Sequence, residues 1–124
     1  MYLILAADDD PSFSVALKEF LESRGYLVEQ ASSGIEASEK AQQLRPCLII
    51  LDMQMPVTYG SSVYDSLQRQ EATRNIPVIF LSGFPVETIK KAVPSSANVK
   101  VVHKSADWRP LEQAIHELLK DKPL

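Results

Sequence analysis

Residues able to perform phosphoryl chemistry follow several apolar runs of the sequence. Each lies within three residues of the end of such a run, and they are Asp8, Asp9, Asp10, Asp52, Ser82 and Lys104. A carboxylate can attack phosphorus to give an acyl phosphate, so Asp52 is the candidate nucleophile. Phosphoryl transfer needs in-line positioning and neutralised phosphoryl oxygens more than covalent help from the protein. The Lys104 ammonium and the Ser82 hydroxyl could supply part of that neutralisation.

The consecutive aspartates at positions 8–10 indicate a divalent-cation site beside Asp52. Carboxylates brought together repel one another unless a cation compensates their charge. An all-oxygen set with two or three carboxylates suits Mg²⁺ or Mn²⁺, with water in the remaining positions. A purely structural interpretation is that the aspartates cap a helix and keep a loop solvated. That interpretation fits Asp10, but it fits Asp52 poorly, because Asp52 ends a very apolar run without opening a helix.

Five apolar runs rich in Leu, Ile and Val alternate with stretches of helical character. The runs are Tyr2–Ala7, Tyr26–Gln30, Leu48–Leu51, Ile76–Leu81 and Val99–Val102. Three of them are apolar almost throughout, which is typical of parallel strands covered on both faces. The alternation predicts an α/β doubly wound, five-stranded parallel sheet of flavodoxin-like (βα)5 type, with strand order 2-1-3-4-5. Ligands of such sheets bind beyond the carboxyl ends of the strands, where the polar residues fall.

The helices expected between these runs carry their own end signals. Asp10 is expected to cap the first helix, with a proline at the next position, and Gly25 is expected to end it. Ser33 and Glu36 form a capping-box pattern for the second helix, which Pro46 ends. Three more helices are expected at 61–72, at 86–93 and from residue 107 onward.

The last helix carries an apolar stripe that begins at Trp108, and we assign this stripe to the core rather than to a cofactor site. His103 alternates with Lys104 along the fifth strand, so its side chain is expected to point away from the site.

Composition limits the classes of protein to which the chain can belong. It has 124 residues, 45% of them hydrophobic and 23% charged, and a net charge of -3. We therefore expect one globular domain over residues 1–124, with no output domain, no direct nucleic-acid binding and no membrane association. The single cysteine, Cys47, cannot form an internal disulfide and fits a reducing, cytoplasmic setting.

The ordered set of motifs resembles the receiver domain of bacterial two-component response regulators over essentially the whole chain. The motifs are Asp8-Asp9-Asp10-Pro11-Ser12, Leu51-Asp52-Met53-Gln54-Met55-Pro56 with Gly60, Leu81-Ser82-Gly83 and His103-Lys104. The resemblance implies that Asp52 is the phosphoacceptor and that Ser82 and Lys104 bind the phosphoryl group. It also implies that Mg²⁺ or Mn²⁺ is held by Asp8, Asp9, Asp52 and the backbone carbonyl of Gln54.

The same resemblance implies partners and an output. The phosphodonor would be a histidine kinase or a histidine phosphotransfer protein, as in a phosphorelay. The phosphoryl group would shift the face formed by the fourth helix, fifth strand and fifth helix, which serves an output domain or effector protein or a homodimer. The chain would act as a phosphoacceptor signalling domain that only phosphorylates and dephosphorylates itself, not as an enzyme.

Three positions bear on how such a domain would work. Ser105 stands where the family usually has a proline joined through a cis peptide. A cis bond costs about 0.5–1 kcal/mol before proline but about 2.5–4 kcal/mol otherwise, so we predict a trans Lys104–Ser105 bond. Val101 replaces the family's usual switch aromatic, and valine has few rotamers. Phe84, two residues beyond Ser82, is predicted to shield an acyl phosphate from water.

Three other functions are alternatives to this interpretation. A haloacid-dehalogenase-type phosphatase needs a second carboxylate two residues after the nucleophile, where this chain has Gln54. A flavodoxin needs a Ser/Thr/Gly-rich phosphate loop, where this chain has repelling aspartates. The remaining alternative is a receiver-like interaction module that docks a partner without being phosphorylated, which Ser105 and Val101 favour.

Overall fold

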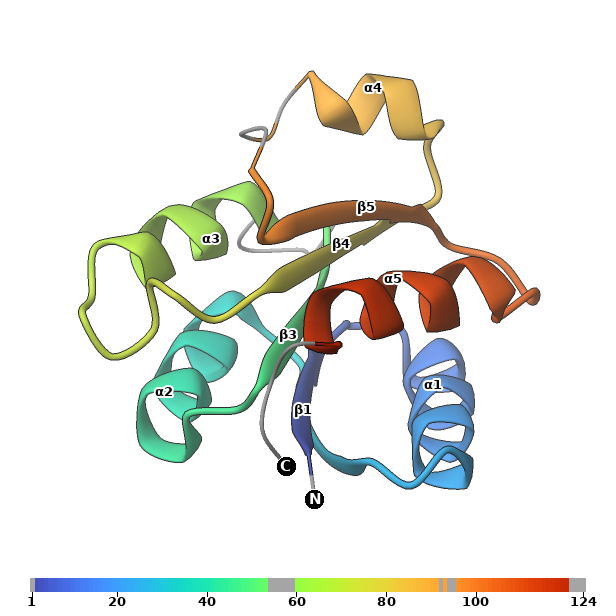
Figure 1. Cartoon of the computed structure of the whole chain (residues 1–124), viewed down its shortest axis with the longest axis horizontal. Coiled ribbons are helices and arrows are strands. Elements are labelled where there is room, and N and C mark those ends of the chain that lie inside the picture. Colours follow the sequence, from blue (N-terminus) through green and yellow to red (C-terminus); the bar gives the residue numbers. More distant parts are fainter. Residues whose placement is uncertain (1, 54–59, 92, 94–95, 121–124) are drawn as a thin grey trace.

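The chain folds into a five-stranded parallel sheet with helices on both faces, in a computed structural model that describes residues 2–53, 60–91, 93 and 96–120 (Figure 1). The elements in chain order are β1 (Leu3–Ala7), α1 (Pro11–Ser23), β2 (Leu27–Ala31), α2 (Gly34–Leu44), β3 (Leu48–Asp52), α3 (Gly60–Gln68), β4 (Val78–Ser82), α4 (Val86–Lys90), β5 (Val99–His103) and α5 (Arg109–Leu119). The strand order is β2-β1-β3-β4-β5. The doubly wound architecture and the order 2-1-3-4-5 predicted from the sequence are confirmed.

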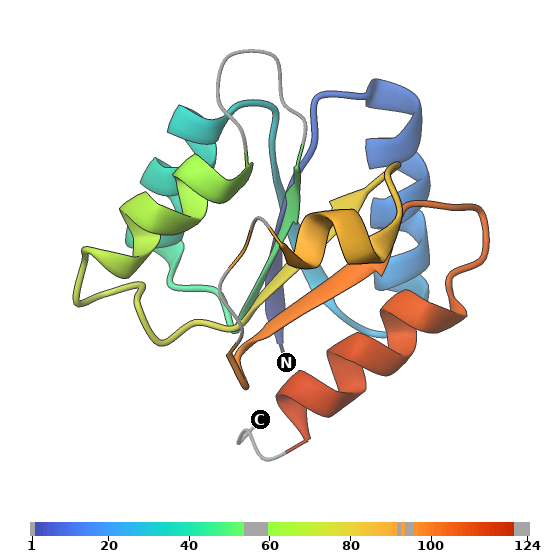
Figure 2. The same cartoon turned by 90° about the horizontal axis from the view of Figure 1, so that it is seen from above.

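The alternation of side chains along the strands divides the core into two layers. Leu5 and Leu51 point into one layer, beneath α2 and α3, whereas Ile4 and Ile50 point into the other, beneath α1 and α5. Figures 1 and 2 both place α2 and α3 on one side of the sheet and α1 and α5 on the other. β3 and β4 are buried over their whole length because they are covered on both faces.

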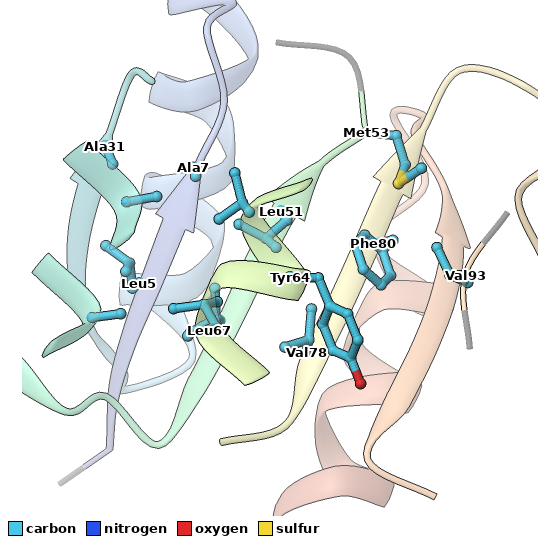
Figure 3. Close-up of a cluster of buried hydrophobic side chains, with 14 of the residues drawn as sticks. Leu5, Ala7, Ala31, Leu51, Met53, Tyr64, Leu67, Val78, Phe80 and Val93 are labelled. Carbon is cyan, nitrogen blue, oxygen red and sulfur yellow. The ribbon is translucent and has the colours of Figure 1, made fainter. Parts of the chain in front are cut away.

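Aromatic side chains anchor both layers of the core. In the layer beneath α2 and α3, the rings of Tyr64 and Phe80 meet edge to face with centroids 5.6 Å apart (Figure 3). In the opposite layer, Trp108 stacks on Phe20 of α1 at 5.0 Å and contacts the ring of Phe13 at 5.6 Å. Trp108 therefore packs on the core, as the apolar stripe predicted.

The predicted ends of α1 and α2 are confirmed, except that the Glu36 carboxylate accepts a different backbone N–H from the one expected. The Asp10 carboxylate accepts the N–H groups of the first turn of α1, and Gly25 adopts a φ of 90° just beyond its end. The Ser33 hydroxyl accepts the N–H of Glu36 at 3.2 Å. The Glu36 carboxylate, however, returns to the N–H of Ser32 at 2.7 Å rather than to that of Ser33. The capping box is thus displaced by one residue.

The other three helices are shorter or begin later than predicted. α3 ends at Gln68, because the next residues form i to i+3 bonds and Thr73 donates its buried hydroxyl to the Leu67 carbonyl. α4 spans only Val86–Lys90, where β-branched residues lower helix propensity. α5 begins at Arg109, whose N–H donates to the Asp107 carboxylate at 3.1 Å.

Within the described residues, every helix is too short or too polar to cross a membrane.

Candidate functional site

The carboxyl ends of the strands bring together the polar residues that were singled out from the sequence. Asp52 is the last residue of β3 and Ser82 the last of β4, while Asp8 and Lys104 directly follow β1 and β5. In β3, Leu48 and Ile50 belong to the layer beneath α1 and α5. By the two-residue period, Asp52 faces that same layer. These four residues lie far apart in the sequence, and the strand order makes them neighbours.

Three carboxylates form a tight cluster at this edge. Oxygen atoms of Asp8, Asp9 and Asp52 all lie within 4.8 Å of one another. Asp8 and Asp52 are each only 5% exposed, whereas Asp9 is exposed. The backbone N–H of Asp10 donates to Asp8 Oδ1 at 2.8 Å and so fixes that carboxylate. Oxygen donors of this kind, partly buried and close together, fit a hard divalent cation such as Mg²⁺.

Lys104 extends over the cluster from the end of β5. Its Nζ lies 2.8 Å from Asp8 Oδ2 and 3.7 Å from Asp52 Oδ2. Burial alone would lower the pKa of the Lys104 ammonium, but the hydrogen bond to Asp8 and the neighbouring carboxylate charges raise it above its usual value. The lysine is therefore a fixed positive charge at neutral pH, next to the carboxylate that is the candidate nucleophile.

Ser82 is almost fully buried and connects the loops around the cluster. Its carbonyl oxygen accepts the N–H of Lys104 at 2.7 Å, which ties the start of the β5–α5 segment to β4. Its hydroxyl oxygen accepts the N–H of Phe84 at 3.0 Å. A hydroxyl that accepts one hydrogen bond can still donate its proton to another acceptor.

Other predicted features of the site have mixed outcomes. Gln54 lies outside the described residues. Asp10 acts as the helix cap, as predicted, and offers its carboxylate to α1 rather than to the acidic cluster. The Lys104–Ser105 peptide is trans, as predicted. His103 is exposed, and its Nδ1 lies 3.3 Å from the Phe84 carbonyl oxygen.

One residue at the site was not found from the sequence. The ring of Phe13, in the first turns of α1, lies beneath the Lys104 ammonium, with 4.4 Å between the ring centroid and Nζ. In the sequence, Phe13 is only one of the apolar residues that mark the buried face of α1. Its contact with Lys104 depends on how α1 packs against the β5–α5 segment, and the apolar spacing carries no signal of it.

Comparison with known proteins finds one family. The model of the response regulator receiver domain matches residues 4–116. The tetrathionate response regulatory protein TtrR of Salmonella typhimurium is 31% identical over an alignment that covers 96% of this chain and 57% of TtrR. The DNA-binding dual master transcriptional regulator RpaA of Synechocystis is 44% identical over 79 residues, which cover 64% of this chain and 33% of RpaA. The chain thus spans between a third and little more than half of these relatives.

Solved structures share the fold over nearly their whole length. The chemotaxis protein CheY4 of Vibrio cholerae has a TM-score of 0.86 and 30% identity, with 96% of this chain and 99% of that chain covered. The response regulator TrrA of Thermotoga maritima, solved in complex with Mg²⁺ and BeF, has a TM-score of 0.83 and 28% identity, with 96% and 100% covered.

Proposed function

This chain belongs to the response regulator receiver domain family, and from that premise we propose that it accepts a phosphoryl group on Asp52 in a Mg²⁺-dependent reaction. The observation that carries the proposal is the position of the nearly buried Asp52 carboxylate, which is grouped with Asp8 and Asp9 and lies 3.7 Å from Lys104 Nζ. The family is a phosphoacceptor signalling module rather than an enzyme acting on a separate substrate. We propose that the donor is a histidine kinase or a histidine phosphotransfer protein.

In the proposed reaction, a carboxylate oxygen of Asp52 attacks phosphorus in line with the bond to the donor. The new O–P bond forms as the P–N bond to the donor histidine breaks, and the electron pair of that bond leaves with the histidine. The Lys104 ammonium binds one phosphoryl oxygen, and the Ser82 hydroxyl donates to another. Both groups interact with the negative charge on the phosphoryl oxygens, so they stabilise the transferred group and the transition state.

A divalent cation bound beside Asp52 would complete this charge balance. Asp8, Asp9 and Asp52 would hold it, together with the backbone carbonyl of Gln54. Bound there, Mg²⁺ or Mn²⁺ supplies positive charge that neutralises phosphoryl oxygens. The N–H of Asp10, which donates to Asp8 Oδ1, keeps that carboxylate oriented for this role.

We propose that residues 1–124 form one receiver domain. Phosphorylation would then be signalled through the surface formed by α4, β5 and α5. The Lys104 N–H bond to Ser82 connects the site directly to the end of β5. Val101, on β5, is half-buried against the core and has no ring to rotate. Signalling would therefore use shifts of α4 and the β5–α5 segment, toward an output domain, an effector or a second copy of the chain.

A phosphorylation-independent docking module is the second candidate. Val101 and Ser105 favour it, because they replace two parts that members of the family usually use for switching. The carboxylate cluster with its lysine argues against it, because buried charges gathered in this way serve no purpose in a surface that only docks a partner.

Amide spectra of the protein with Mg²⁺ and beryllofluoride, a mimic of the phosphoryl group, separate the two candidates. The receiver function predicts shifts at the carboxyl ends of β1, β3 and β4 and along β5 and α5, and their absence in Asp52→Asn. Asp65→Asn, an exposed carboxylate of α3, is the matched control and should respond as the original protein does. If the original protein shows no Mg²⁺-dependent shift, the docking module is favoured.

A further inference from the structure

The ring of Phe13 supports the site lysine from α1. Lys104 Nζ lies 4.4 Å from the ring centroid, and a cation within about 6 Å of an aromatic face is attracted by the ring quadrupole. The attraction grows when water is excluded, and the Lys104 side chain is only 19% exposed. We propose that Phe13 is a positioning residue that holds the Lys104 ammonium at the carboxylates, an inference that rests on the proposed function.

Phe13 can do this because its own ring is held in place. Trp108, just before α5, lies 5.6 Å from the Phe13 ring with the planes at 45°. Trp108 also stacks on Phe20, at 5.0 Å and 10°. Figures 1 and 2 show α1 and α5 on the same side of the sheet, the side on which these rings pack. The three rings join α1 to the β5–α5 segment beneath the lysine.

The physical need for such a support follows from the lysine itself. A lysine side chain has four rotatable carbon–carbon bonds, and holding the ammonium in one position costs the conformational entropy of these bonds. The Asp8 carboxylate holds Nζ on one side, at 2.8 Å. The ring of Phe13 occupies space that water would otherwise fill and attracts the cation there. Without the ring, the ammonium gains solvated rotamers in which it is too far from Asp52 to meet a phosphoryl group.

The expected effect is confined to the step that uses the lysine. Phe13→Leu keeps a branched apolar side chain, shorter than phenylalanine, and removes the ring face. Affinity for beryllofluoride in the presence of Mg²⁺ should fall about three- to thirtyfold, the range of one cation–π contact. Affinity for Mg²⁺ alone should not fall, because Asp8, Asp9 and Asp52 are untouched and a less firmly held lysine competes less for them. Phe13→Tyr, which restores the ring face, should bind both ligands nearly as the original protein does.

The experiment is a pair of titrations of the full chain, with Mg²⁺ alone and with Mg²⁺ plus beryllofluoride, for the original protein, Phe13→Leu, Phe13→Tyr and Phe20→Leu. Phe20→Leu removes a ring of the same stack whose cation contact is with Arg24, at 5.1 Å, so it reports the effect of loosening the packing. Phe13→Met replaces the leucine variant if that variant does not fold. A selective loss in Phe13→Leu, recovered in Phe13→Tyr and not matched by Phe20→Leu, supports the inference.

Four results with these variants would overturn it. These are an unchanged beryllofluoride affinity in Phe13→Leu, an equal loss in Phe13→Tyr, an equal loss in Phe20→Leu, or a parallel loss of Mg²⁺ and beryllofluoride binding in Phe13→Leu, which is the sign of a merely structural role. If the original protein binds no beryllofluoride, the proposed function fails and the inference fails with it. If the original protein binds beryllofluoride and the leucine variant binds equally well, only the inference fails.

Discussion

Lys104 and Asp8 form an ion pair, with 2.8 Å between Nζ and Oδ2, although they extend from strands that are not neighbours in the sheet. β3 and β4 lie between β1 and β5, so the pair spans the centre of the carboxyl edge. The same ammonium lies 3.7 Å from Asp52. The lysine thus stands between a residue proposed to bind the cation and the residue proposed to take the phosphoryl group, and its charge is available to either.

Removal of this lysine is expected to affect cation and phosphoryl binding in opposite directions. Lys104→Met should tighten Mg²⁺ binding by about tenfold, because it removes a positive charge close to two of the ligand carboxylates. The same variant should lose most of its response to beryllofluoride. Isothermal titration of both ligands measures the two effects. Lys100→Met, a lysine of β5 that pairs with Glu117, is the control and should change neither affinity.

Loss of a carboxylate from the cluster of Asp8, Asp9 and Asp52 should lower the affinity for Mg²⁺. Asp9→Asn is expected to weaken Mg²⁺ binding by about tenfold or more, since Asp9 is an exposed member of the cluster and carries one of its charges. Unfolding in urea should show little change, because an exposed carboxylate adds little to stability. An Mg²⁺ affinity equal to that of the control variant Asp65→Asn would remove Asp9 from the site.

Asp10 is expected to matter for stability more than for the cation. Its carboxylate accepts the N–H groups of Ser12 and Phe13, so Asp10→Ala should lower the free energy of unfolding by about 1 kcal/mol. Asp10→Ser, which keeps a capping oxygen, should recover most of that loss in urea unfolding. If Asp10→Ala weakened Mg²⁺ binding more than Asp9→Asn did, the assignment of Asp10 as a cap alone would be wrong.

Phe84 is predicted to prolong the life of the acyl phosphate. Its side chain is 48% exposed, and its N–H donates to the Ser82 hydroxyl, which places the residue at the edge of the site. Phe84→Ala should shorten the phosphoryl half-life severalfold, because water reaches the acyl phosphate more easily. Phe84→Leu, which keeps apolar bulk, should stay near the original value. Decay of the phosphorylated protein after donor removal measures this, and an unchanged half-life in Phe84→Ala would refute the shielding role.

The fold and the meeting of the polar residues at one edge of the sheet could be predicted because the first follows from a periodicity and the second from the strand order. Apolar runs gave the five strands, and parallel strands place their carboxyl ends at one edge. Asp8, Asp52, Ser82 and Lys104 therefore had to meet once the strand order was known. The caps at Asp10 and Ser33 were recognised because capping is a local interaction, written within four residues of sequence.

What the sequence did not reveal depends on packing between distant segments. The contact of Phe13 with Lys104 requires the angle between α1 and the β5–α5 segment, which no local pattern encodes. The early end of α3 depends on the buried Thr73 hydroxyl, which bonds to Leu67, and the sequence gives no sign that Thr73 is buried. The hydrogen bond from the Ser32 N–H to the Glu36 carboxylate is a similar case, because the N–H groups of Ser32 and Ser33 compete for that one carboxylate.

Intact-mass measurement with peptide mapping shows whether Asp52 receives a phosphoryl group. The protein is incubated with acetyl phosphate, with and without Mg²⁺, next to Asp52→Asn and the control Asp65→Asn. We expect one phosphoryl group per chain, on the peptide that contains Asp52, only with Mg²⁺, and missing in Asp52→Asn but not in Asp65→Asn. An original protein that stays unmodified with Mg²⁺, or an Asp52→Asn variant modified to the same extent, would refute phosphorylation at Asp52.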